Sequence, residues 1–126
     1  MVLNEGRYRG EFILMEQDGT LSRSTVILTV AASTKLPAGT VVGRLTGTGK
    51  YVVYDNDATD GSETARGVTY DNNDNSAGVA PADFNAVVLD FGAELRRADL
   101  NFGTSDAGKI AAAVADLLAV AIKLRS

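Results

Sequence analysis

Short runs of β-branched and apolar residues, separated by turn residues, are the feature that most restricts the fold of this chain. Residues 25–30, 40–45 and 50–54 are such runs, and the segments between them are rich in Gly, Pro, Asp and Asn. Thr46-Gly47-Thr48-Gly49 predicts a hairpin turn between the second and third runs. Closely spaced short strands are typical of an all-β sandwich or barrel, and the full chain predicts about seven or eight of them.

Other segments are expected to be irregular or weakly structured. Residues 1–10 carry charge and glycine but little apolar pattern, and we interpret them as an arm. Residues 31–35 and the polar stretch 71–78 predict loops, and Pro81 argues against regular pairing near it. The remaining strand predictions cover residues 64–70, 85–89 and 93–97.

The hydrophobic period changes from two to about 3.6 after residue 104, which predicts a helix. Thr104-Ser105-Asp106 offers an N-cap and a carboxylate that suits the helix dipole. One apolar face is expected to pack on the core, and its members are Ile110, Val114, Leu117, Leu118 and Ala121. Residues 122–125 alternate and predict a terminal strand. The expected fold is therefore mainly β, a β-clip-like or small-barrel domain, with one C-terminal α-helix.

Composition excludes several classes of function. The chain of 126 residues has no Cys and no His, so disulfides, thiolate catalysis and imidazole chemistry are absent. A net charge of −4 disfavours nucleic acid as a partner, because duplex binding needs a surplus of Lys and Arg. The longest apolar stretch, residues 110–122, is broken by Asp116, and residues 1–20 lack a signal-peptide pattern, so we expect an intracellular product without a membrane partner.

Three motifs suggest chemistry. Tyr8-Arg9-Gly10-Glu11 resembles a tetrapeptide that trimeric dUTPases carry beside a catalytic carboxylate, the position that Glu5 would fill. The other motifs of those enzymes, a Gly-Arg-Ser-Ser phosphate segment and a glycine-rich tail, do not occur. A dUTPase-like nucleotide hydrolase is therefore the alternative and not the leading hypothesis.

The other two motifs have simpler explanations. The sequence GRLTGTGK, residues 43–50, lacks the first glycine and the Ser or Thr of a P-loop, and a hairpin turn explains it. The acidic segment from Asp55 lacks the glycine and glutamate of an EF-hand at their required positions, so a solvated loop is favoured over a cation site. We expect no cofactor and no bound metal.

The most specific similarity covers the middle of the chain. It lies in LPAGTVVGRL, residues 36–45, and GKYVVYDNDATDGSETARGVTYDN, residues 49–72, with further matches at Gly10-Glu11-Phe12-Ile13 and Ser22-Arg23. These segments resemble the lambda-like family of head decoration (capsid-stabilising) proteins of tailed bacteriophages. The Asp60-Gly61-Ser62-Glu63-Thr64-Ala65 segment resembles that family and not the dUTPases, which share the broad β-clip class.

The resemblance implies a capsid decoration protein that is not an enzyme. It implies a homotrimer, made in the host cytoplasm, that binds the major capsid protein at three-fold and quasi-three-fold sites on the outside of the virion. There it would stabilise the head against internal DNA pressure. Residues 1–20 would be the capsid-binding arm and residues 21–126 the β-rich domain, with Tyr8, Phe12, Ile13 and Leu14 as capsid-binding residues. A β-clip module that binds carbohydrate stays open as a further alternative, although the chain has no Trp for sugar stacking.

Overall fold

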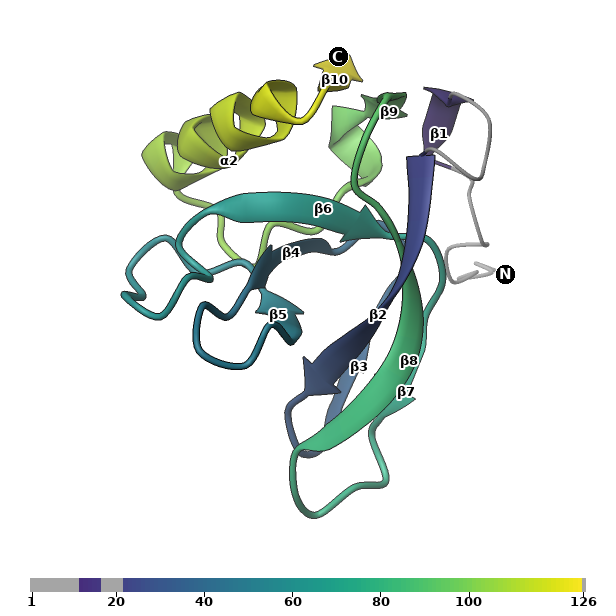
Figure 1. Cartoon of the computed structure of the whole chain (residues 1–126), viewed down its shortest axis with the longest axis vertical. Coiled ribbons are helices and arrows are strands. Elements are labelled where there is room, and N and C mark those ends of the chain that lie inside the picture. Colours follow the sequence, from purple (N-terminus) through teal and green to yellow (C-terminus); the bar gives the residue numbers. More distant parts are fainter. Residues whose placement is uncertain (1–11, 17–21, 126) are drawn as a thin grey trace, which may run out of the picture.

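A computed structural model describes residues 12–16 and 22–125, and within them the fold is mainly β. Figure 1 shows the arrangement of the elements along the chain. The strands are β1 (Ile13–Glu16), β2 (Arg23–Val30), β3 (Thr34–Leu36), β4 (Val41–Arg44), β5 (Tyr51–Val53), β6 (Ala65–Thr69), β7 (Asn73–Asn75), β8 (Ala82–Leu89), β9 (Ala93–Arg96) and β10 (Ile122–Arg125). The helices of the described part are the 3-10 turn η1 (Arg97–Asp99) and the α-helix α2 (Ala107–Ala119).

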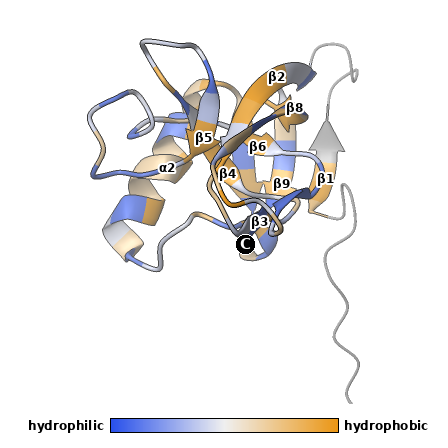
Figure 2. Ribbon diagram, turned by 90° about the horizontal axis from the view of Figure 1, so that it is seen from below, coloured by the Kyte–Doolittle hydropathy of each residue, from blue (hydrophilic) through white to orange (hydrophobic). Residues whose placement is uncertain are grey.

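Five strands close into a barrel in the order β2-β5-β4-β6-β8. Its longest ladder joins β2 and β8 antiparallel along all of β2, from Arg23 opposite Leu89 to Val30 opposite Ala82. Leu28, Val30 and Val88 are fully buried inside it. Figure 2 shows hydrophobic residues concentrated on β2, β4, β5 and β8. The predictions of a small barrel and of the β4–β5 hairpin are confirmed, while the β-clip assignment stays a prediction.

A second sheet lies at one end of the barrel, with strand order β1-β9-β10 (Figure 1). β1 runs antiparallel to β9, and β10 runs parallel to it. The side chains beneath this sheet form one core with α2, in which Leu95, Leu117 and Ile122 are fully buried. The predicted terminal strand is confirmed as β10.

Two carboxylates fix α2 in place. Asp106 is the N-cap, and its side chain accepts hydrogen bonds from the backbone N–H groups of Gly108 (2.9 Å) and Lys109 (3.1 Å). Asp116 lies in the middle of the helix and accepts from the backbone N–H of Ala65, the first residue of β6, at 3.0 Å. The helix is thus tied to the barrel by a charge-assisted hydrogen bond as well as by its buried face.

Three expectations about local structure were wrong. Residues 34–36 and 73–75 are not loop but the strands β3 and β7, which pair with each other. Regular pairing also begins directly after Pro81, because β8 starts at Ala82. Leu118 and Ala121 do not belong to the packed face of α2. Leu118 is 61% exposed, Ala121 is exposed and lies beyond the end of the helix, and Ala113 takes a place in the core instead. Among the described residues, no helix is long and apolar enough to cross a membrane.

The barrel wall leaves no room for a side chain at Gly43. A Cβ atom there would lie 2.7 Å from the Cα of Ser62 and 2.9 Å from the carbonyl oxygens of Ser62 and Thr64. All three atoms belong to backbone, so neither a rotamer change nor a small shift relieves the clash. The register of β4 on β6 shifts at this point, between Val42 and Gly43.

We therefore expect Gly43→Ala to destabilise the fold by about 1–3 kcal/mol, the usual cost of overpacking. Gly47→Ala is the matched control, because a Cβ at Gly47 would have no neighbour within 4 Å. Urea unfolding of both variants measures the difference in the free energy of unfolding. Equal stability of the two variants would show that the wall can open at Gly43.

Candidate functional site

β1 is the first described strand and lies at the edge of its sheet. On one side it pairs with β9, with Ile13 opposite Leu95 and Glu16 opposite Ala93. In the strand order of the described residues no strand follows β1 on the other side. An edge strand presents backbone N–H and C=O groups to which an extended segment of another protein can add.

Phe12, one of the four predicted capsid-binding residues, lies inside the folded body. Its side chain is fully buried in the core shared with α2, and its carbonyl oxygen accepts from the N–H of Arg96 at 2.8 Å. A Cβ atom at Gly39 would come within 3.4 Å of the Phe12 ring, and Gly39 has a φ of 86° that favours glycine. The turn around Gly39 therefore forms part of the buried site in which the Phe12 ring packs.

The other predicted residues are placed differently. Ile13 is half-buried and packs against the same core, whereas Leu14 is 44% exposed. Tyr8 lies outside the described residues, as do Glu5 and the rest of the dUTPase-like tetrapeptide. Within the segment that we expected to be an arm ending at residue 20, Ile13–Glu16 pair with β9 as β1, and Phe12 and Ile13 pack against the core. A capsid-binding role for the four residues stays a prediction. Because Phe12 is buried, its contribution is limited to positioning the neighbouring residues.

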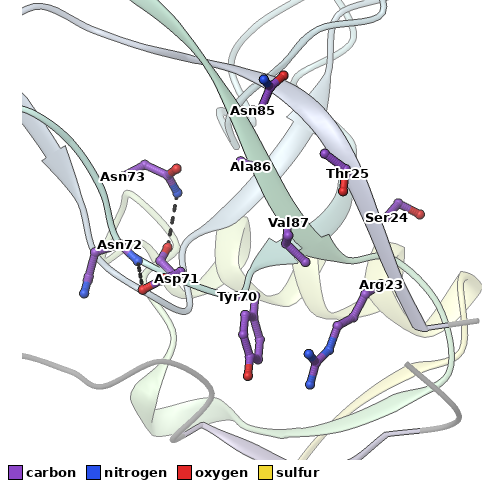
Figure 3. Close-up of a pocket in the computed structure, with 10 residues that line it drawn as sticks. All are labelled: Arg23, Ser24, Thr25, Tyr70, Asp71, Asn72, Asn73, Asn85, Ala86 and Val87. Carbon is purple, nitrogen blue, oxygen red and sulfur yellow. Dashed lines mark hydrogen bonds between the residues drawn. The ribbon is translucent and has the colours of Figure 1, made fainter. Parts of the chain in front are cut away.

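A polar groove of about 550 Å³ lies on the outer face of β2 and β8, next to the connection between β6 and β7. Arg23 and Tyr70 lie side by side at one end and Asn85 at the other (Figure 3). The Arg23 guanidinium stands 4.0 Å from the centre of the Tyr70 ring, a cation–π contact. Because the guanidinium covers one ring face, a sugar could stack there only by displacing it.

Local turn chemistry shapes this groove. The carboxylate of Asp71 accepts from the N–H of Asn72 at 2.8 Å, and the side chain of Asn73 donates to the Asp71 carbonyl at 3.1 Å (Figure 3). The sequence did not predict the groove, because Arg23 and Tyr70 are far apart in the chain. The one available signal was that Ser22-Arg23 and Tyr70-Asp71 both carry the family resemblance, and the structure places them together.

The segments that resemble a P-loop or a cation site form hydrogen bonds and ion pairs with other residues of the chain. The Lys50 ammonium lies 2.7 Å from the Asp83 carboxylate and lowers the pKa of Asp83. The hydroxyl and N–H of Ser62 hydrogen-bond to Asp60 and lower the pKa of that exposed carboxyl group. Asp57 forms an ion pair with Lys109 of α2, which raises the pKa of Lys109.

The side chain of Tyr54 also anchors α2 to the acidic loop that follows β5. The Tyr54 hydroxyl donates to the carbonyl oxygen of Lys109 at 2.9 Å, and burial raises the pKa of Tyr54. Tyr54 is 3% exposed and belongs to the main core. The ion pair between Asp57 and the Lys109 side chain is a second contact, beside the hydrogen bond from Tyr54 to the Lys109 backbone. The start of α2 is therefore attached to the segment after β5 at two points.

A family model described as bacteriophage lambda head decoration protein D matches residues 2–122 of the chain. The chain therefore belongs to this family of head decoration proteins. It is a structural component of the phage virion and binds the outer surface of the head. A comparison with curated proteins found no match.

We expect Phe12→Ala to lower the free energy of unfolding by about 3–5 kcal/mol, because it empties a fully buried aromatic site. Leu14→Ala should cost less than about 1 kcal/mol, since nearly half of that side chain is already exposed. Chemical denaturation of the two variants measures both values. A stability of Phe12→Ala equal to that of the parent protein would place Phe12 outside the core.

Proposed function

We propose that the chain acts as a homotrimer at the three-fold and quasi-three-fold positions of the head. There it contacts the major capsid protein and stabilises the shell against the pressure of packaged DNA. The family match over residues 2–122, which covers nearly the whole chain, is the observation that carries this proposal. A trimer on a three-fold site presents the same surface to each of the surrounding capsid subunits.

We infer that the N-terminal residues up to β1 make the attachment, with Tyr8 and Leu14 as contacts and Ile13 at the boundary of the body. The edge position of β1 and the 44% exposure of Leu14 support this assignment. Phe12 then has a supporting role. Its buried ring fixes the start of β1 on the folded body.

Avidity makes three weak attachments sufficient. Ordering a peptide segment costs about 1–2 kcal/mol per residue in backbone entropy, so one attachment alone binds weakly. Once one copy of a trimer is bound, the other two are held near their sites at high effective concentration. Linked binding of this kind can exceed the single affinity by about 10²–10⁴.

We infer that the protein performs this role without catalysis. The family is one of structural capsid proteins, and the chain lacks the phosphate-binding motifs that a nucleotide hydrolase requires beside Glu5. Mechanical attachment needs no proton transfer and no nucleophile, which agrees with a chain that has neither His nor Cys.

Removal of residues 2–11 should weaken binding to expanded capsids by about 10² or more, because the avidity of three attachments is lost together. The truncation keeps Phe12, whereas a cut beyond it would also remove a core side chain. Co-sedimentation with capsids measures binding, and thermal unfolding checks that the body is intact. Val79→Ser, a change at a 98% exposed side chain remote from β1 in the chain, is the control and should bind normally. Undiminished binding of the truncated protein would reject the arm's role.

Incubation with dUTP and Mg²⁺ separates the enzymatic alternative. We expect no pyrophosphate above the level of a protein-free blank. Release of pyrophosphate that Glu5→Gln abolishes would instead establish nucleotide hydrolysis and overturn the proposal of a purely structural role.

A further inference from the structure

Two arginines on neighbouring strands line one small pocket of the barrel. Arg44 is the last residue of β4, Arg66 is the second residue of β6, and both are exposed. With Leu45 and Thr46 they line a pocket of about 190 Å³. The turn after β4 and the loop before β6 extend from the same side of the barrel (Figure 1). Two positive charges therefore share a space smaller than the roughly 300 Å³ at which pockets for drug-sized ligands begin.

A β-bulge places Arg66 at this pocket. On β6, Gly67 pairs with Val42 and Ala65 pairs with Gly43. Arg66 lies between these two pairs and has no partner on β4, which makes it the extra residue of the bulge. Bulges re-aim a side chain and are over-represented beside functional sites. The irregular pairing therefore brings a second guanidinium to the end of β4.

Neither guanidinium has a carboxylate partner within residues 12–16 and 22–125, the ranges that the structure describes. Ion pairs in these ranges are formed by Lys50, Arg96, Lys109 and Arg125, whereas Arg44 and Arg66 form none. Glu63, a carboxylate close to Arg66 in the chain, accepts from the N–H of Gly61 at 2.7 Å. The two positive charges are therefore left uncompensated, and like charges on neighbouring strands destabilise a sheet.

The turn between β4 and β5 holds Arg44 in position. A Cβ atom at Gly49 would lie 3.2 Å from Nη2 of Arg44 and 3.6 Å from its Nε, so the guanidinium packs along the backbone of the turn. The N–H of Thr46 donates to the carbonyl oxygen of Asp60 at 2.8 Å, which ties this turn to the loop before β6. The Thr46 side chain also lines the pocket, and its hydroxyl is a third donor there.

We propose that Arg44 and Arg66 form a binding site for one small tetrahedral oxyanion of the phosphate class. A guanidinium presents its N–H donors as a planar fork, and this fork matches two oxygens of a phosphate group. An oxyanion in the pocket accepts hydrogen bonds from both arginines and neutralises the repulsion between them. The Thr46 hydroxyl donates to a further oxygen. The small volume of the pocket suits a single oxyanion and not a nucleotide.

This site gives the segment GRLTGTGK a role that its likeness to a P-loop did not. A P-loop holds phosphate with the backbone N–H groups of a glycine-rich loop and with a lysine. In this chain Lys50 is paired with Asp83, and Arg44 stands where the first glycine of a P-loop would be. The anion is bound by arginine side chains instead. Because they come from β4 and β6, a bound oxyanion connects the two strands where their register shifts.

Titration with sodium phosphate, followed by the amide signals in NMR spectra of the whole protein, tests the site. We expect the signals of Leu45, Thr46 and Arg66 to shift and to saturate, whereas sodium chloride of equal ionic strength should not move them. Arg44→Gln and Arg66→Gln should each weaken binding by about tenfold or more, because each removes a charge-assisted partner. Arg97→Gln is the matched control, since Arg97 is exposed and does not line this pocket.

Thermal unfolding provides a second measurement on the same proteins. A ligand that binds only the folded state raises its stability, so phosphate should raise the unfolding temperature of the parent protein above the value in chloride. The double variant with Arg44→Gln and Arg66→Gln should show no such rise. At low salt without phosphate this variant should be at least as stable as the parent, because the repulsion between the two arginines has been removed. Lower stability of the variant under these conditions would contradict an uncompensated pair.

Three results of the titration would overturn the site. Equal shifts in chloride would show a general effect of salt. Unchanged phosphate affinity in both Arg44→Gln and Arg66→Gln would place the anion elsewhere. Loss of binding in Arg97→Gln as well would show that overall charge decides, and not this pocket. Attachment to the phage head is tested separately by the removal of residues 2–11, so either proposal can fail without the other.

Discussion

The ladder between β2 and β8 is the constraint on which the rest of the structure depends. All eight residues of β2 are paired along it. Because side chains alternate between the two faces of a strand, a slip of one residue would turn Leu28 and Val30 out of the barrel. The same ladder sets the outer face with Thr25 and Asn85 in the polar groove. At its end the N–H of Asp90 donates to the carbonyl of Ser22, which fixes where β9 and its sheet begin.

The second sheet connects this barrel to β1, the strand at which we propose that the protein attaches to the phage head. β9 lies between β1 and β10, so the first and last described strands flank one central strand. The core below them joins Phe12 to α2 and, through Asp116, to β6. Phe12, α2 and β6 therefore belong to one continuous packed unit.

The period of the sequence predicted the helix and most strands, and turn residues predicted the hairpin, since these features depend on residues close together in the chain. The small barrel was predicted from the number of short strands, whereas the pairs that close it, such as Arg23 with Leu89, are far apart in the chain. The strand β7 was missed because Asn73-Asp74-Asn75 has the composition of a loop. It is held by long-range contacts instead: the Asn75 side chain donates to the carbonyls of Val30, Ala31 and Ala80. Leu118 was placed in the core because adjacent apolar residues at 117 and 118 leave the centre of a helical face ambiguous. For Phe12, strand propensity was visible but the partner strand, more than eighty positions later in the chain, was not. The polar groove was missed for the same reason, because Arg23 and Tyr70 are also far apart in the chain.

Burial of Phe12 also has a mechanical consequence for a protein that must stay attached while the head is under strain. Tension in the preceding residues is transmitted first to an aromatic ring enclosed by the core, and only afterwards to the hydrogen bonds between β1 and β9. Detachment of β1 therefore requires extraction of that ring into water, a step that raises the barrier to forced unfolding. For the attachment that we propose, the contact with the shell should therefore break before β1 separates from its own subunit.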